Sequence, residues 1–196
     1  MDTSASFLES LQSEGSNERW TRLVDLYSPL IRRWLTRLGA AISDLDDLEQ
    51  EVLAVVVRRF PDFELREQVG SFRNWLRTIC GNCLKEQWRK RKKGPQGVGG
   101  TDFGQQLEQF ADAQSELSRI WNEEHDRHVT RHLLAQVQSM VTESTWRTFK
   151  RFALDGCSAD EVAAELGCTA NAVFIAKSRV MAKLRQLGKG LLEDDL

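Results

Sequence analysis

Residues 158–188 read SADEVAAELGCTANAVFIAKSRVMAKLRQLG, and this stretch decides how the end of the chain folds. Its first four residues, Ser158 to Glu161, form a capping box, in which a serine hydroxyl and a glutamate carboxylate satisfy free backbone amides at a helix start. Gly167 supplies the left-handed conformation that ends a helix, and Thr169 begins the next one. The stretch therefore predicts a short helix, a tight turn and a longer helix, which is the order of a helix-turn-helix.

The longer of the two predicted helices has two unlike faces. At about 100° per residue, Val173, Ala176, Val180, Leu184 and Leu187 fall on one side. The opposite side carries Asn171, Phe174, Ile175, Ser178 and Arg185. The basic residues Lys177, Arg179, Lys183, Arg185 and Lys189 have no acidic neighbour in this helix. Such a face predicts contact with the major groove and the phosphates of DNA, whereas the structural alternative is an ordinary helical hairpin with a cationic end.

The rest of the 196-residue chain also has helical periodicity. Apolar residues recur at steps of three and four along 20–38, 45–56 and 72–84, and again along 117–137 and about 142–154. Gly39 and Pro61 follow the first two stripes as stop signals, and Ser43 or Asp44 can cap the second. With only three prolines and few alternating Val, Ile and Thr residues, the sequence predicts an all-α fold.

A glycine-rich segment separates two groups of predicted helices. Residues 94–104 contain five glycines and one proline, a composition that buries too little apolar surface to hold one conformation. We therefore predict two small helical domains, at 1–93 and 114–196, joined by a flexible linker at 94–113, with the helix-turn-helix in the second domain.

The charges of the chain are unevenly distributed. The whole sequence has a net charge of -2, but residues 71–93 hold eight basic residues against one acidic residue, Glu86, so this segment carries +7 and the rest carries -9. A cationic end turn of a helix accounts for two or three such charges. Concentrated positive potential of this size predicts a site for a polyanion.

Two stretches resemble motifs of a known family. Asp44-Leu-Asp-Asp-Leu-Glu-Gln-Glu-Val52 resembles the D-x-E-D-L-x-Q-E-V-F signature of bacterial sigma factors of the extracytoplasmic-function branch, and Ser71-Phe-Arg-Asn-Trp-Leu-Arg-Thr-Ile79 is similar to its F-R-x-W-L-x-x-I. Asn82, Glu86 and Arg89 match the residues that follow. The resemblance covers most of the chain and implies two partners, core RNA polymerase and promoter DNA, and leaves an anti-sigma factor as a third.

The resemblance also implies three groups of site residues. The acidic helix would dock on the clamp helices of polymerase, and the next helix, with the preceding loop 60–70, would open and read the minus-ten element, where bases need apolar walls beside a cationic track. The stripe positions of Phe72 and Trp75 place at least one of them in the core. For polymerase binding the residues are Asp44, Asp47, Leu48, Gln50, Glu51 and Val52. For minus-ten DNA they are Phe63, Ser71, Phe72, Arg73, Asn74, Trp75, Arg77, Asn82, Lys85, Arg89 and Lys90. For minus-thirty-five DNA they are Thr169, Asn171, Phe174, Ile175, Lys177, Ser178, Arg179, Lys183 and Arg185.

The predicted recognition helix departs from the family at one point. Where the family usually has T-V-K-S-R, this chain has Ala172-Val-Phe-Ile-Ala176, so Phe174 and Ile175 replace the customary Lys and Ser. Exposed apolar groups at these positions fit thymine methyl groups or the surface of another protein.

Other sequence signals are weaker. Cys80-Gly-Asn-Cys83 has the spacing of a redox or zinc pair, but no second pair completes a tetrahedral site. His125, His128 and His132 lie near one helix face, and we interpret them as part of a solvated surface. No catalytic arrangement, cofactor, signal peptide or membrane span is predicted, so we expect a cytoplasmic protein that is not an enzyme.

Two other functions compete with a transcription initiation factor. A self-sufficient helix-turn-helix regulator could bind duplex DNA as a dimer, but it has no obvious use for the acidic helix at 44–51. A thiol oxidoreductase using Cys80 and Cys83 would lose its activity in a Cys80→Ser variant, whereas a sigma factor should tolerate that change.

Overall fold

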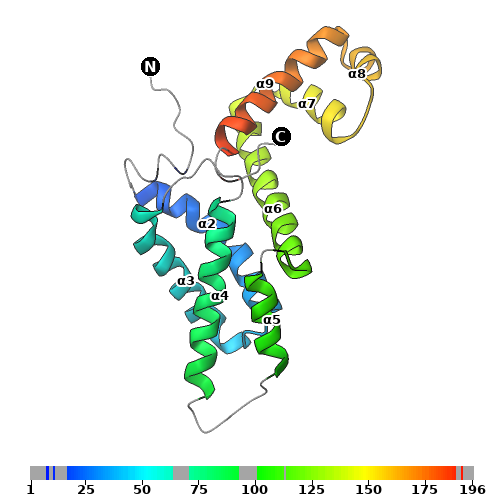
Figure 1. Ribbon diagram of the computed structural model, residues 1–196. Helices are drawn as coiled ribbons and strands as arrows, with labels where there is room; N and C mark the ends of the chain where they lie inside the picture. Colours follow the sequence, from blue (N-terminus) through cyan, green and yellow to red (C-terminus); the bar gives the residue numbers. More distant parts are fainter. Residues whose placement is uncertain are drawn as a thin grey trace.

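The computed structural model describes residues 8, 11, 17–63, 71–92, 101–112, 114–188 and 191. In this part of the chain every regular element is a helix, which confirms the predicted all-α class (Figure 1). None of these helices is both long and apolar enough to cross a bilayer.

The first three long helices correspond to the first three apolar stripes. They are α2 (Asn17–Arg37), α3 (Leu45–Arg59) and α4 (Ser71–Lys92), and two short 3-10 turns, η1 (Ile42–Asp44) and η2 (Phe60–Asp62), precede and follow α3. Gly39 ends the first of these segments with a φ of 86°, as the stop signal predicts. Asp44 lies at the N-cap position of α3, but its side chain makes no capping hydrogen bond, so this part of the prediction was wrong.

A helix lies inside the predicted linker. Thr101–Ala111 forms α5, which packs between α4 and the next helix, α6. Its Phe110 ring is buried against Trp34, with ring centroids 5.4 Å apart, and it also lies next to Gly81 of α4. Four of the five glycines that predicted the linker precede Thr101. The glycine-rich composition therefore describes the residues before α5, and the prediction extended it wrongly over the helix.

The longest helix, α6 (Glu116–Met140), packs against both halves of the molecule (Figure 1). In its first half Trp121 and His125 are fully buried beside α2, and in its second half Leu133 and Val137 are buried where the helix packs on α9. Helix α6, the first helix of the predicted domain 114–196, thus contributes to the core of the predicted domain 1–93.

The remaining helices form the C-terminal unit. They are α7 (Glu143–Phe149), a π-helical segment η3 (Lys150–Leu154), α8 (Ala159–Leu166) and α9 (Ala170–Gly188). The capping box of Ser158 and Glu161 is present with both of its bonds, and Gly167 ends α8 with a φ of 63°. The predicted short helix, left-handed turn and long helix are therefore confirmed.

Candidate nucleic-acid interface

The exposed face of α3 is smaller than the sequence suggests. Of the six residues predicted to bind a protein partner, Asp47, Gln50 and Glu51 are exposed, whereas Leu48 and Val52 are buried in the core. The Asp44 carboxylate is half-buried, accepting a hydrogen bond of 2.6 Å from Gln87 and pairing with Arg91, both on α4. Three side chains with carboxylate or amide groups are thus free to face a partner.

Glu49, in the same acidic stretch, faces α2 instead of solvent. Its carboxylate accepts hydrogen bonds from Ser28 and from Arg32, the latter at 2.5 Å. Arg32 also donates to Asp46 at 2.6 Å. The hydrogen bond to Glu49, and to a smaller extent the one to Asp46, raises the pKa of Arg32. The network fixes α3 against α2 and so orients the exposed acidic face.

The aromatic residues predicted to hold unstacked bases form a packed cluster. Phe63 and Phe72 are buried, and their rings meet edge to face with centroids 5.7 Å apart. Trp75 lies 4.8 Å from Phe63 and is only partly buried. Of these three rings, Trp75 is the only one that is not buried, so it offers the most surface with which to contact a base. The loop residues 64–70 lie outside the described part of the chain.

Two of the predicted DNA-binding arginines on α4 are buried. Arg73, with 4% of its side chain exposed, donates to both carboxylate oxygens of Asp126 on α6, at 2.8 and 2.6 Å. Arg77 is buried as well, and burial together with the charge of Arg73 lowers its pKa. As the structure stands, neither guanidinium forms part of the cationic surface that the charge count predicted.

The cationic surface of α4 consists of its outward residues. Of the predicted minus-ten set, the exposed members are spread along the helix and are Asn74, Asn82, Lys85, Arg89 and Lys90. Ser71 is the first residue of α4, and its side chain, like that of Lys92, lies outside the described part, as does Lys93. A row of amide and cationic side chains along one helix can contact the backbone and base edges of a nucleic acid.

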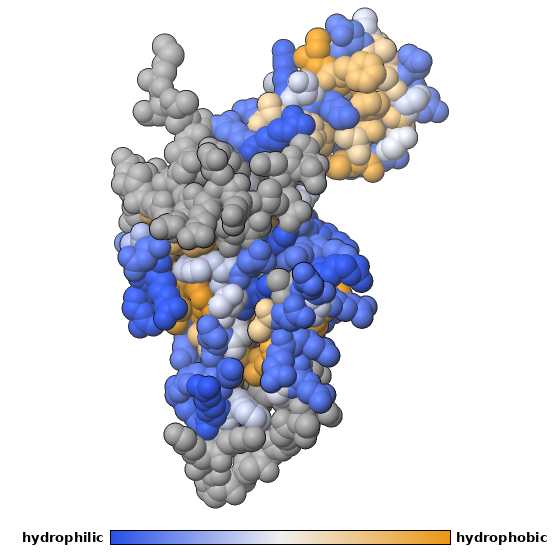
Figure 2. Space-filling view, viewed as in Figure 1, coloured by the Kyte–Doolittle hydropathy of each residue, from blue (hydrophilic) through white to orange (hydrophobic). Residues whose placement is uncertain are grey.

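The outward face of α9 has the predicted composition. Asn171, Phe174, Ile175, Ser178 and Arg185 are exposed, while Val173, Ala176, Val180 and Leu184 are buried. Thr169, also exposed, accepts a hydrogen bond of 3.2 Å from the backbone amide of Ala172 through its hydroxyl, so it acts mainly as a cap. Lys177 and Arg179 are exposed, Lys183 is partly buried, and Lys189 lies outside the described residues. Figure 2 shows apolar surface gathered on this C-terminal unit, among blue polar patches.

Comparison with known families concerns the faces of α3 and α4. Residues 23–94 match the family model for sigma-70 region 2. The match covers most of α2 and all of α3 and α4, and it supports a factor of the sigma-70 family. No curated protein matched the sequence significantly. The C-terminal unit lies beyond the matched residues.

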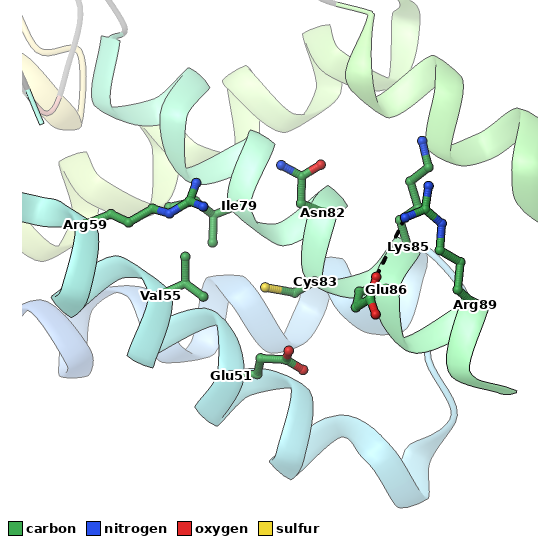
Figure 3. A pocket seen from close by; sticks show the side chains of 9 residues that line it. All are labelled: Glu51, Val55, Arg59, Ile79, Asn82, Cys83, Lys85, Glu86 and Arg89. Atoms are coloured by element: carbon green, nitrogen blue, oxygen red, sulfur yellow. Dashed lines mark ion pairs between the residues drawn. The ribbon is translucent and has the colours of Figure 1, made fainter. Parts of the chain in front are cut away.

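An open hollow lies between α3 and α4 within the region that resembles sigma-70 region 2. Its volume is about 370 Å³, and Figure 3 shows its lining, which includes Glu51 and Arg59 of α3 and Asn82, Lys85 and Arg89 of α4. Glu86 and Arg89 form an ion pair of 3.7 Å along its rim. The hollow therefore joins the exposed acidic face to the cationic row, and its lining carries both signs of charge.

The two cysteines of the C-x-x-C spacing are buried beside this hollow and within the core. Burial raises the pKa of both thiols, to about 11 for Cys83, which is far from a reactive thiolate at neutral pH. The four cysteines of the chain are free. Within the described residues, no cluster of three or more His, Cys, Asp or Glu side chains could hold a metal ion.

A buried polar network behind the interface was not foreseen. His125 is fully buried, and the interpretation of the three histidines as a solvated surface was therefore wrong for this one. Its Nδ1–H donates to Asp126 at 2.9 Å, and its Nε2 accepts from the Tyr27 hydroxyl at 3.2 Å, so the neutral ring satisfies both partners. His128 bonds the backbone oxygen of Leu26, at 2.6 Å. His125 falls at i+4 from Trp121 and i-4 from Val129, so the spacing of the apolar stripe was the signal that placed it inside.

Proposed function

We propose that this chain is a transcription initiation factor of the extracytoplasmic-function branch, which binds core RNA polymerase, directs it to specific promoters and helps to melt the DNA. The observation that carries the proposal is the match of residues 23–94 to sigma-70 region 2. The exposed Asp47, Gln50 and Glu51 lie within that match, as does the cationic row of α4. We assign no catalytic step and no cofactor to the chain.

The proposed division of labour follows from charge and exposure. The carboxylates of α3 suit a cationic surface on polymerase, while Asn82, Lys85, Arg89 and Lys90 suit the backbone and base edges of an opened minus-ten strand. The outward face of α9 would enter the major groove of the minus-thirty-five element. Two anchors on one DNA orient polymerase, and a protein that meets both partners would work in the cytoplasm.

The decisive experiment mixes the purified chain with bacterial core RNA polymerase. We expect a complex that survives gel filtration and that gives specific run-off transcripts from a promoter library. Failure to form any complex at micromolar protein would overturn the proposal.

A charge reversal tests the docking face itself. Asp47→Arg should weaken polymerase binding at least tenfold while leaving helicity unchanged, because it places a cation in the acidic face. Asp25→Arg is the matched control, since Asp25 is an exposed residue of the neighbouring helix α2. Equal binding by both variants would count against docking through α3.

A second candidate is a stand-alone regulator that binds duplex DNA as a dimer. The observation that favours it is the exposed face of α9 with Lys177 and Arg179, which suits duplex DNA by itself and lies beyond the residues of the family match. This candidate predicts a dimer in solution and full duplex binding by the Asp47→Arg variant, with no effect of core polymerase. An anti-sigma factor remains a proposed partner of the first candidate only.

A further inference from the structure

The middle of the outward face of α9 carries two large apolar side chains. Phe174 is 53% exposed and Ile175 is 43% exposed. With about 100° of rotation per residue, they lie on either side of a line through Asn171, Ser178 and Arg185. Large apolar groups in contact with water are unfavourable, and when they occupy the centre of a polar strip they mark a contact surface.

Phe174 is held in position from behind. The ring of Phe152 meets it edge to face, with centroids 5.5 Å apart and planes at 86°. Phe152 belongs to the π-helical segment η3, and π turns are frequent at functional sites. The Lys177 ammonium lies 5.6 Å above the Phe152 ring and restrains it further. The Phe174 ring is thus presented in one orientation before any partner arrives.

Cations flank the apolar pair on both sides. The same rotation places Lys177 at one border of the outward face and Arg179, with Lys183 beyond it, at the other. The helix Ala170–Gly188 contains no acidic residue. The face therefore complements a partner with anionic walls on both sides and apolar groups along its middle. Duplex DNA has this arrangement, because phosphates border the major groove and the thymine C5-methyl is the apolar group on its floor.

We propose that Phe174 and Ile175 recognise thymine methyl groups in the major groove and make α9 selective for thymine at neighbouring base pairs. The inference rests on the proposed function, in which α9 enters the groove, and adds the bases that it selects. A methyl group removed from water on each side chain contributes about as much as one buried CH₂, which corresponds to about fourfold in affinity per thymine.

The test removes one methyl group at a time from the DNA. Duplexes are selected from a randomised pool with the full-length chain, alone and with core polymerase, and each thymine of the selected site is then replaced by deoxyuridine, which lacks only the methyl group. We expect two positions at which the replacement weakens binding about fourfold. Phe174→Ser should abolish the effect at one position and Ile175→Ser at the other.

Two variants control for general effects. Ile42→Ser makes the same change at a residue of η1 that is 85% exposed, and it should leave both methyl effects intact. Arg179→Ser should weaken all duplexes alike and reduce the salt dependence, because a phosphate contact carries no sequence information.

Each other outcome has a defined meaning. If a duplex is selected but deoxyuridine binds as well as thymidine, the inference is overturned while the proposed function stands. If Phe174→Ser and Ile175→Ser leave duplex affinity unchanged but abolish the polymerase complex, the face docks on protein and the inference is overturned. If no duplex is selected under either condition, duplex recognition by α9 fails as well, whereas complex formation with polymerase still tests the first anchor separately.

Discussion

Replacing Asp126 by asparagine should destabilise the fold more than any exposed charge change, because Asp126 neutralises a buried arginine. Arg73 has 4% of its side chain exposed and donates to both oxygens of this carboxylate. Removing one partner of a buried ion pair costs about 3 to 5 kcal/mol. Asparagine keeps one acceptor oxygen and Asp126 is 35% exposed, so we expect a loss near the lower limit, about 2 to 3 kcal/mol.

A double-mutant cycle separates the pair from its surroundings. Arg73→Met keeps the aliphatic part of the side chain and should cost less, because Asp126 still meets water and His125. The double variant should be closer to the wild type than the sum of the two single changes, with a coupling of about 2 kcal/mol, since no unpaired charge remains buried.

The measurement is urea unfolding followed by far-ultraviolet circular dichroism at pH 7. Glu123→Gln is the matched control, because Glu123 also lies on α6 and pairs with Arg119, and both side chains are more than half exposed. Its loss should stay within about 1 kcal/mol. If Asp126→Asn costs no more than Glu123→Gln, then Arg73 is solvated and the Arg73–Asp126 pair does not link α4 to α6.

Three further outcomes follow from the buried groups and the turn. Burial lowers the pKa of His125, so the unfolded chain takes up a proton near pH 6.5, before the folded chain does. The stability that the neutral ring contributes above that pH should therefore be lost progressively as the pH falls below about 6.5, as urea unfolding would measure. The fall should shrink in His125→Gln but not vanish, because burial also lowers the pKa of His132; an unchanged slope would refute the assignment. Gly167→Ala should cost about 1 kcal/mol of unfolding free energy, because alanine at a φ of 63° is strained although no atom lies within 4 Å of its Cβ, and a neutral effect would argue against the left-handed turn. Iodoacetamide at pH 8 should label Cys157 and Cys168 well before Cys80 and Cys83, as peptide mass spectrometry would detect, and early labelling of Cys80 would contradict its burial.

Features set by neighbours in the sequence could be predicted, and those set by distant partners could not. The capping box at Ser158 and the left-handed turn at Gly167 depend on residues within one helical turn, and both are present as predicted. The apolar face of α9 follows from the helical repeat alone. By contrast, the sequence predicted an exposed Arg73 because it lies on the polar side of α4, but α6 covers that side and supplies Asp126 from 53 residues away.

The same distinction between local and distant partners applies to the candidate site. The helical repeat and the family resemblance located the outward residues Asn82, Lys85 and Arg89 correctly as exposed groups of α4. The apolar stripe also placed at least one of Phe72 and Trp75 in the core, and Phe72 is buried there. It could not place Phe63, which lies outside the stripe and packs on both rings, because an aromatic residue beside a cationic helix fits a base-binding wall and a core position equally well. Helix α5 escaped prediction because Phe110 owes its position to Trp34 and Trp121, both far along the chain.

The Arg73–Asp126 pair between α4 and α6 also determines which cations can act at an opened promoter strand. Arg73 cannot hold Asp126 with both of its bonds and bind a phosphate at the same time, whereas Lys85 is exposed on α4. On the proposed function, Lys85→Met should therefore lower the slope of log affinity against log salt by about 0.7, the value for one contact to a single strand. Arg73→Met should leave the slope unchanged. The measurement is the affinity of the reconstituted polymerase complex for a premelted promoter over a range of salt. If Arg73→Met lowers the slope instead, then α6 leaves α4 on DNA binding, and the buried pair is broken in the course of promoter opening.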